Sequence, residues 1–195
     1  GMVSIFWSNN VEINNCEFNS NKLSDDTLHI LQSNISLNDL NFRNCNNDCL
    51  DLDFVNGEIY NINFFNSNND ALDLMTSNIE AKNINIQKSQ DKGISVGEKS
   101  KINLHNIYVK NSNIGIEVKD NSYVNIANSK LEKNSIALNL YKKKIEYDGE
   151  EEVFLNNINF SENVLDIMAS ESGIVYIENI NYNLKKEGNG KFIYN

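Results

Sequence analysis

The fold can be inferred from Leu50-Asp51-Leu52, because the same apolar-x-apolar triplet returns 22 residues later as Leu72-Asp73-Leu74. Triplets at this interval run along most of the chain: Leu28-His29-Ile30, Leu50-Asp51-Leu52, Leu72-Asp73-Leu74, Ile94-Ser95-Val96, Ile116-Glu117-Val118 and Leu138-Asn139-Leu140. Self-similarity at a fixed period of this length is typical of repeat proteins, in which each unit buries its apolar face against the next. The sequence therefore predicts a solenoid.

Two further alternating stretches precede the triplet in most units. The first stretches are Val11-x-Ile13, Ile35-x-Leu37, Ile79-x-Ala81, Ile102-x-Leu104, Val124-x-Ile126, Val153-x-Leu155 and Val175-x-Ile177. The second are Cys16-x-Phe18, Leu40-x-Phe42, Ile62-x-Phe64, Ile84-x-Ile86, Ile107-x-Val109, Ile158-x-Phe160 and Ile180-x-Tyr182. Apolar residues at i and i+2 are the β period, and no 3.6-residue helical period or leucine-rich-repeat signature runs through the units. We expect an all-β, right-handed parallel β-helix of about eight coils, with three short strands per coil.

Equivalent side chains on successive coils should stack about 4.8 Å apart. Phe18, Phe42 and Phe64 are expected to form one ladder. A ladder of asparagines, whose amides can bond to one another at the turns, is expected at Asn19, Asn44, Asn66 and Asn111. The complete absence of proline fits a chain in which nearly every strand is internal.

The three cysteines, Cys16, Cys45 and Cys49, are interpreted as structural. Their odd number and the lack of a CxxC motif argue against a disulfide framework or a zinc site. Cys16 occupies a core position, and the other two stand in columns of small residues.

The net charge of −10 limits the classes of partner. Nucleic acid is excluded because phosphate binding requires a basic surface, and an anionic membrane surface is disfavoured for the same reason. No apolar run is long enough for a transmembrane helix, and no signal peptide is visible, so no membrane insertion is expected. A metal cation, a neutral glycan, or an anionic glycan bridged by a metal remains as partner.

Residues 1–195 are interpreted as one domain, with a charged turn insertion at residues 141–152. No amphipathic capping helix is evident at either end, although an open solenoid end requires a cap. This favours a fragment of a longer protein, with ends covered by further domains or by end-to-end self-association.

Acidic residues gather beside the triplets. Asp48 should stack over Asp70, and Asp51 over Asp73, one strand spacing apart. Carboxylates at that range repel, so that at least one pKa should rise unless a cation intervenes. Ca²⁺, which takes six to eight oxygen ligands, would fit these four aspartates. The alternative is that the aspartates cap turn amides without any metal.

Lys92 occupies the column of Asp26, Asp48 and Asp70. It is either a charge partner of Asp70 and Asp91, or a base that removes the proton α to a uronate carboxylate. A lysine base needs a lowered pKa, which nearby carboxylates oppose unless bound Ca²⁺ neutralises them.

Glu117 and Lys119, on the coil after Lys92, are candidate substrate-binding residues. His29 and His105 stand in different columns and are interpreted as isolated surface or turn residues.

Across essentially its whole length, the repeat resembles the parallel β-helix of pectate-lyase-like proteins. The run Asn69-Asp70-Ala71-Leu72-Asp73-Leu74 is similar to the Asp-Asp-Gly-Leu-Asp-Leu motif of family 9 polysaccharide lyases. That resemblance implies Asp70 and Asp73 as Ca²⁺ ligands, Asp48 as a further ligand and Lys92 as base. The motif departs at Asn69 and at Ala71, and no basic residues for substrate carboxylates lie alongside.

A second resemblance is more detailed. Residues 91–98, residues 115–122 and Tyr141-Lys142-Lys143 are similar to uncharacterised bacterial β-helix regions of surface proteins. This resemblance implies a secreted or cell-surface protein without a known activity.

Three functions follow as expectations. The first is a carbohydrate-engaging β-helix module with a Ca²⁺ site on its acidic face. The second is a Ca²⁺-dependent lyase that cleaves a uronic-acid polysaccharide by β-elimination. The third is a structural or adhesive spacer without a ligand.

Overall fold

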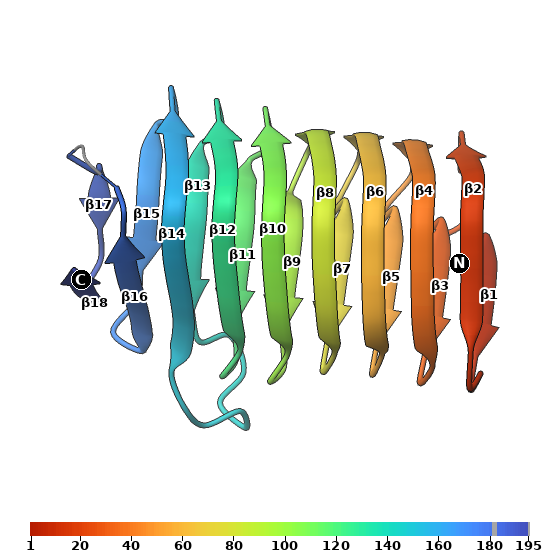
Figure 1. Cartoon of the computed structure of the whole chain (residues 1–195), viewed down its shortest axis with the longest axis horizontal. Helices are drawn as coiled ribbons and strands as arrows, with labels where there is room; N and C mark the ends of the chain where they lie inside the picture. The colour runs from red at the N-terminus through yellow and green to blue at the C-terminus, as the bar shows by residue number, and fades with distance from the viewer. Residues whose placement is uncertain (181–182, 195) are drawn as a thin grey trace.

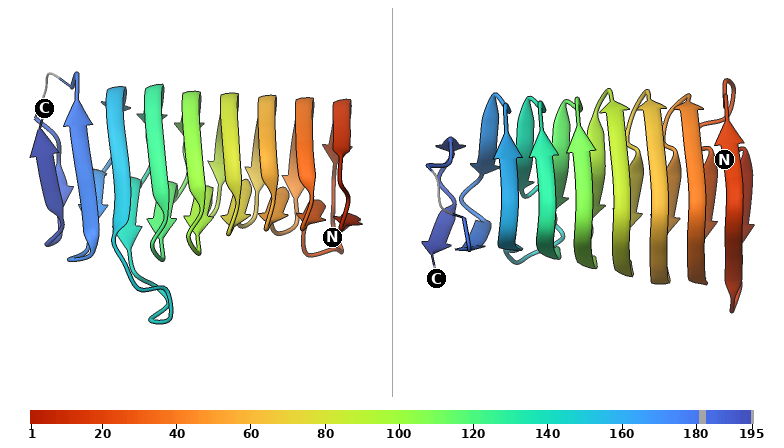
Figure 2. Two further views of the ribbon diagram at one scale, coloured as in Figure 1. Left: turned by 60° about the horizontal axis from the view of Figure 1, so that its bottom comes forward. Right: turned by 45° about the horizontal axis from the view of Figure 1, so that its top comes forward.

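The computed structural model describes residues 1–180 and 183–194, and these residues form a parallel β-solenoid (Figure 1). Every pairing between neighbouring strands is parallel, and no helix occurs in the described residues. The predicted fold class is therefore confirmed. Two nine-stranded sheets, here named sheet A and sheet B, run along the stack and face each other (Figure 2).

The strands of sheet A are short. They are β1 (Val3–Phe6), β3 (Leu28–Leu31), β5 (Leu50–Asp53), β7 (Leu72–Met75), β9 (Lys92–Gly97), β11 (Ile114–Lys119), β13 (Ile136–Tyr141), β15 (Leu165–Ala169) and β17 (Lys186–Glu187). Those of sheet B are mostly longer: β2 (Val11–Asn19), β4 (Asn34–Cys45), β6 (Asn56–Ser67), β8 (Asn78–Ser89), β10 (Lys101–Lys110), β12 (Tyr123–Glu132), β14 (Glu151–Ser161), β16 (Gly173–Glu178) and β18 (Lys191–Tyr194).

The three alternating stretches of each unit occur as two strands, because the first two are continuous within sheet B. The long strands bend near their middle at a residue with positive φ, such as Asn61 (φ 55°) in β6 and Asn83 (φ 57°) in β8. Asparagine tolerates this left-handed conformation better than most residues. The bend turns the second half of the strand without interrupting the strand.

The core lies between the two sheets and is built from the repeated apolar residues. Leu50, Leu52, Leu72 and Leu74 are fully buried. The predicted phenylalanine ladder is present, with ring centroids 4.8 Å apart between Phe18 and Phe42 and 5.0 Å apart between Phe42 and Phe64. Like side chains therefore stack on like, as parallel pairing at a constant period requires.

The predicted asparagine ladder is confirmed in part. The side-chain amide of Asn44 donates to Asn19 (3.3 Å), and that of Asn66 donates to Asn44 (2.9 Å). Lys88 lies at the next level and separates these residues from Asn111. A second ladder follows the bend of sheet B and was not predicted; it contains Asn61, Asn83 and Asn106.

The prediction that the cysteines form no disulfide is wrong for two of them. Cys45 and Cys49 are joined by a disulfide, with their Cα atoms 5.3 Å apart. Cys45 ends β4 and Cys49 immediately precedes β5, so the tight turn between the two sheets brings them together. Cys16 is a free, partly buried cysteine packed against the core.

Tyr182, predicted to continue the second apolar column, lies outside the described residues. Within the described residues, no helix has the length and apolar character needed to cross a membrane.

We predict that Leu72→Ala lowers the free energy of unfolding by about 2–5 kcal/mol, because it removes a fully buried side chain and leaves a cavity. Urea unfolding followed by circular dichroism measures the change. Leu23→Ala, at a leucine that is 96% exposed, serves as the control and should be nearly neutral. Equal effects of the two substitutions would contradict this packing.

Candidate metal centre on the outward face of sheet A

Three columns of side chains lie on the outward face of sheet A. The central column is His29, Asp51, Asp73, Ser95, Glu117 and Asn139, since these residues pair directly in the parallel register. The column at the start of the strands contains Asp26, Asp48 and Asp70, which precede their strands, and Lys92, the first residue of β9. The third contains Leu31, Asp53 and Met75. The acidic residues of neighbouring coils thus lie side by side.

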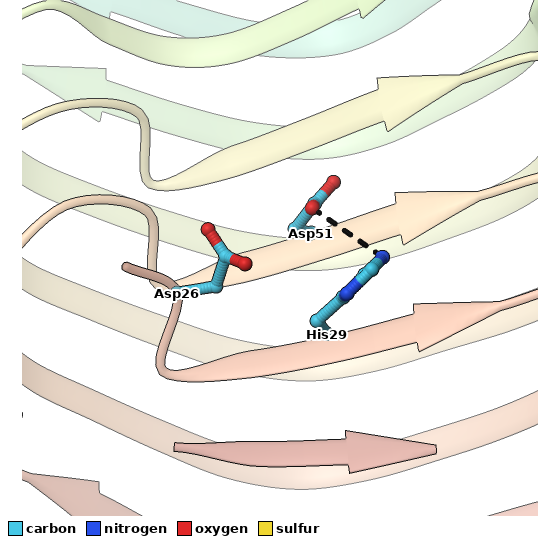
Figure 3. Close-up of side chains that lie close together, drawn as sticks. All are labelled: Asp26, His29 and Asp51. Carbon is cyan, nitrogen blue, oxygen red and sulfur yellow. Dashed lines mark ion pairs between the residues drawn. The ribbon is translucent and has the colours of Figure 1, made fainter. Parts of the chain in front are cut away.

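Asp26, His29 and Asp51 form a group of side chains on this face that could together hold a metal ion. Each offers one ligand atom, and these atoms all lie within 4.8 Å of one another. In Figure 3 the carboxylate of Asp51 faces the His29 ring, with Asp26 beside them. His29 Nε2 lies 3.6 Å from Asp51 Oδ2 and 3.2 Å from Asp53 Oδ2.

The interpretation of His29 as an isolated residue is therefore wrong. His29 and Asp51 occupy the same place in consecutive triplets, so the 22-residue spacing carried a signal for their contact. His105 lies in β10 of sheet B, where its ring contacts the Asn128 amide (2.9 Å), away from the acidic residues.

Burial and mutual repulsion raise the pKa values of several of these carboxyl groups. Burial, followed by the charges of Asp53 and Asp73, raises the pKa of Asp51 to about 8. Burial likewise raises the pKa of Asp48 to about 6, against the hydrogen bond from the Asp70 backbone. Burial raises the pKa of Asp70 to about 7, although the Lys92 charge opposes the rise. The structure thus contains the electrostatic conflict expected from stacked aspartates.

Asp48 and Asp70 also cap turns, which was the alternative role for the acidic column. Asp48 Oδ1 accepts hydrogen bonds from Asp70 N and Asn69 Nδ2, both at 2.8 Å. Asp70 Oδ1 accepts from Lys92 N at 3.0 Å. Capping and metal binding are compatible here, because each carboxylate uses only Oδ1 for these bonds.

Asp51 and Asp73 differ in the polar contacts that their carboxylates make. Asp73 Oδ1 accepts from Leu74 N at 3.0 Å. Among the described residues, the only polar contact of the Asp51 carboxylate is with His29. Asp51 is therefore the least satisfied member of the four predicted ligands.

Lys92 lies among carboxylates. Its Nζ contacts Asp91 and lies 3.5 Å from Asp70 Oδ1 and 4.0 Å from Glu117 Oε1. Burial favours the neutral amine, but the hydrogen bond to Asp91 and the charges of Asp70 and Glu117 outweigh it and raise the pKa of Lys92 above its usual value. Without a bound cation, Lys92 is thus a protonated charge partner at neutral pH.

Glu117 and Lys119 belong to the same network as Lys92. Lys119 Nζ lies 3.7 Å from Glu117 Oε1 and donates to Ser95 Oγ at 2.8 Å. Asn139 Nδ2 donates to Glu117 Oε2 at 3.2 Å. Glu117 and Lys119 are both buried, so their role in substrate binding stays a prediction.

The predicted site residues therefore fall into two groups on one face. Asp51 lies in β5 and Glu117 in β11, three strands away, which corresponds to roughly 14 Å. Oxygen ligands from the aspartates suit Ca²⁺, whereas the imidazole of His29 also suits borderline metals such as Zn²⁺.

The sequence matches no known family model, and no curated protein is significantly similar to it.

In chelator-treated protein, we predict that the free energy of unfolding falls as the pH rises from about 5 to 8. The reason is that Asp51, whose pKa is about 8 in the folded state, holds a proton that the unfolded chain, with an aspartate pKa near 3.9, releases. The slope should reach about 1.4 kcal/mol per pH unit for one such proton. Urea unfolding at several pH values measures it.

The variant Asp51→Asn should reduce this slope, most clearly between pH 7 and 8, above the pKa values of Asp48 and Asp70, whereas Asp39→Asn, at an exposed residue of sheet B, should leave it unchanged. A wild-type stability that is constant from pH 5 to 8 would show that the Asp51 carboxyl is not perturbed.

Proposed function

We propose that this β-solenoid is a carbohydrate-binding module of a secreted or cell-surface protein, in which the outward face of sheet A holds Ca²⁺. The observation that carries the proposal is the convergence of Asp26, His29 and Asp51 on one point, beside the further carboxylates of Asp48 and Asp53. A bound divalent cation would relieve the repulsion among these groups and keep them ionised.

The charge of the chain supports a glycan bound through a metal. A net charge of −10 repels an anionic polysaccharide unless a cation lies between the two. Ca²⁺ held by protein carboxylates keeps coordination positions open for uronate oxygens, because it takes six to eight oxygen ligands. Sheet A presents this site on a long, regular surface, which suits an extended polymer.

The disulfide supports a secreted or cell-surface location. Cys45 and Cys49 form a structural disulfide buried at the turn between the sheets. Such bonds persist in oxidising compartments and are rare in reducing ones.

We predict that chelator-treated protein binds Ca²⁺ with a dissociation constant of roughly 10⁻⁶ to 10⁻⁴ M, measured by titration calorimetry. Asp51→Asn should weaken binding at this site at least about tenfold, because it removes the carboxylate shared by the cluster. Asp39→Asn is the matched control. Titration with Zn²⁺ tests whether the imidazole of His29 changes the metal preference.

Ca²⁺-loaded protein should then be retained on immobilised pectate or alginate and released by chelator. Ca²⁺ binding without retention would leave a metal-stabilised spacer as the function. Failure of the wild-type protein to bind either metal would refute the proposal.

A Ca²⁺-dependent lyase is the second candidate, and it is favoured by the gathering of Lys92, Glu117 and Lys119 beside Asp70. Its difficulty is the raised pKa of Lys92, which a bound cation would have to lower.

If the protein is a lyase, the Ca²⁺-loaded protein will cleave pectate or alginate to unsaturated products, which are detected by their ultraviolet absorbance. Lys92→Ala should abolish product formation. Lys101→Ala, at an exposed lysine of β10 in sheet B, should not. An absence of product from the wild-type protein on both substrates would leave Lys92 as a charge partner.

A further inference from the structure

The insertion between β13 and β14 folds back onto the preceding coil. Residues 142–150 project from one side of the stack (Figures 1 and 2). Lys143 N and Lys144 N donate to Asp120 Oδ1 at 2.7 and 2.6 Å, and Asn121 Nδ2 donates to the Asp148 carbonyl at 2.7 Å. The loop is thus anchored to the end of β11.

The close approach of the loop depends on a glycine. Gly149 has φ 132°, and a Cβ atom there would lie 2.4 Å from the Asn121 side chain. Only a residue without a Cβ can adopt this conformation in so little space.

Two fully buried carboxylates lie beneath the insertion. Asp120 and Glu151 both have zero relative exposure. Among the residues that the structure describes, Asp120 Oδ2 and Glu151 Oε2 have no hydrogen-bond partner. Within residues 1–180 and 183–194, neither carboxylate forms an ion pair with a lysine or arginine. Buried charges of this kind are strongly unfavourable unless something compensates for them.

Both carboxylates lie where the turn after β11 meets the insertion. The Asp120 side chain points toward the following coil, where its Oδ1 accepts hydrogen bonds from the backbone of the insertion. The Glu151 side chain points toward the preceding coil, where its Oε1 accepts a hydrogen bond from Asn121 N at 3.4 Å. Asn121, next to Asp120 in sequence, therefore borders both groups.

The neighbouring lysines are engaged elsewhere. Lys144 Nζ lies 2.6 Å from Glu98 Oε1, and Lys142 Nζ lies 3.4 Å from Asp148 Oδ1. The charge of Lys144 therefore acts on Asp120 only from beyond ion-pair distance, and among the described residues neither lysine forms an ion pair with Glu151. Two carboxylate oxygens without a hydrogen-bond partner are hard donors, which suit a hard divalent cation.

We propose that the insertion encloses a second cation site, in which Asp120 Oδ2 and Glu151 Oε2 bind Ca²⁺ and so fix residues 142–150 against the solenoid. This site is separate from the acidic cluster on sheet A, since Asp51 lies in β5, whereas Asp120 follows β11. The inference does not depend on the proposed function.

The test uses the full chain carrying Asp51→Asn, so that Ca²⁺ binding at the sheet A site is weakened. Trypsin cleavage at Lys142, Lys143 and Lys144, followed by mass spectrometry, reports opening of the insertion. Proteolysis of a rapidly opening segment tracks the population of the open form. Ca²⁺ at ten times its dissociation constant should therefore slow cleavage about tenfold relative to chelator.

This protection should be lost when Asp120→Asn or Glu151→Gln is added, since each replacement keeps the shape but removes a charged ligand. Glu146→Gln removes an exposed carboxylate of the same insertion and should retain the protection. Circular dichroism confirms that each variant is folded.

Three results would overturn the proposal. The first is a cleavage rate in Asp51→Asn protein that is the same with Ca²⁺ as with chelator. The second is protection in the wild-type protein alone, which would assign the effect to sheet A. The third is an undiminished Ca²⁺ response in both Asp120→Asn and Glu151→Gln. Loss of calorimetric binding at sheet A with retained loop protection would refute the proposed function and leave this site intact.

Discussion

The parallel pairing of each coil with the next, in constant register, is the constraint on which the rest of this structure depends. It places equivalent side chains of successive units one strand spacing apart, about 4.8 Å. For Leu, Ile and Phe this repetition is favourable, because like shapes pack into a continuous core. For Asn it is favourable as well, because each amide can donate to the amide of the preceding coil. The same rule is unfavourable for aspartate, since it brings equal charges together.

The acidic face of sheet A shows how this conflict is met. Asp48 and Asp70 each give one oxygen to backbone donors of the following coil, and Lys92 partly neutralises Asp70. Asp51 has neither a backbone donor nor a lysine, and its pKa rises most among the aspartates with a stated value, to about 8. A cation at Asp51 would complete the compensation. The proposed Ca²⁺ site rests on this compensation, and the proposed glycan rests in turn on that site and on the negative charge of the chain.

The fold could be predicted from the sequence, because few architectures other than a stack of coils have a 22-residue period with three apolar columns. The spacing alone also placed Asp48 beside Asp70 and Asp51 beside Asp73.

Other features were not predictable from a repeat pattern. The merging of two stretches into one strand depends on single residues with positive φ, such as Asn61. The disulfide depends on the width of a turn, because Cys45 and Cys49 belong to different columns. The contact of the insertion with Asp120 joins a non-repeating segment to a repeating one, for which no period exists. The contact between His29 and Asp51, in contrast, could have been predicted, because the two residues lie 22 positions apart in the repeat.

The most direct test of the cation centre is anomalous X-ray diffraction from crystals soaked in Mn²⁺, an ion that accepts carboxylate oxygen and imidazole ligands. A peak bounded by Asp26, His29 and Asp51 is the result predicted from the convergence of their ligand atoms. If crystals of the folded protein show no anomalous peak at these three residues, the acidic face of sheet A is not a metal centre, and capping of turns is the role left to Asp48 and Asp70.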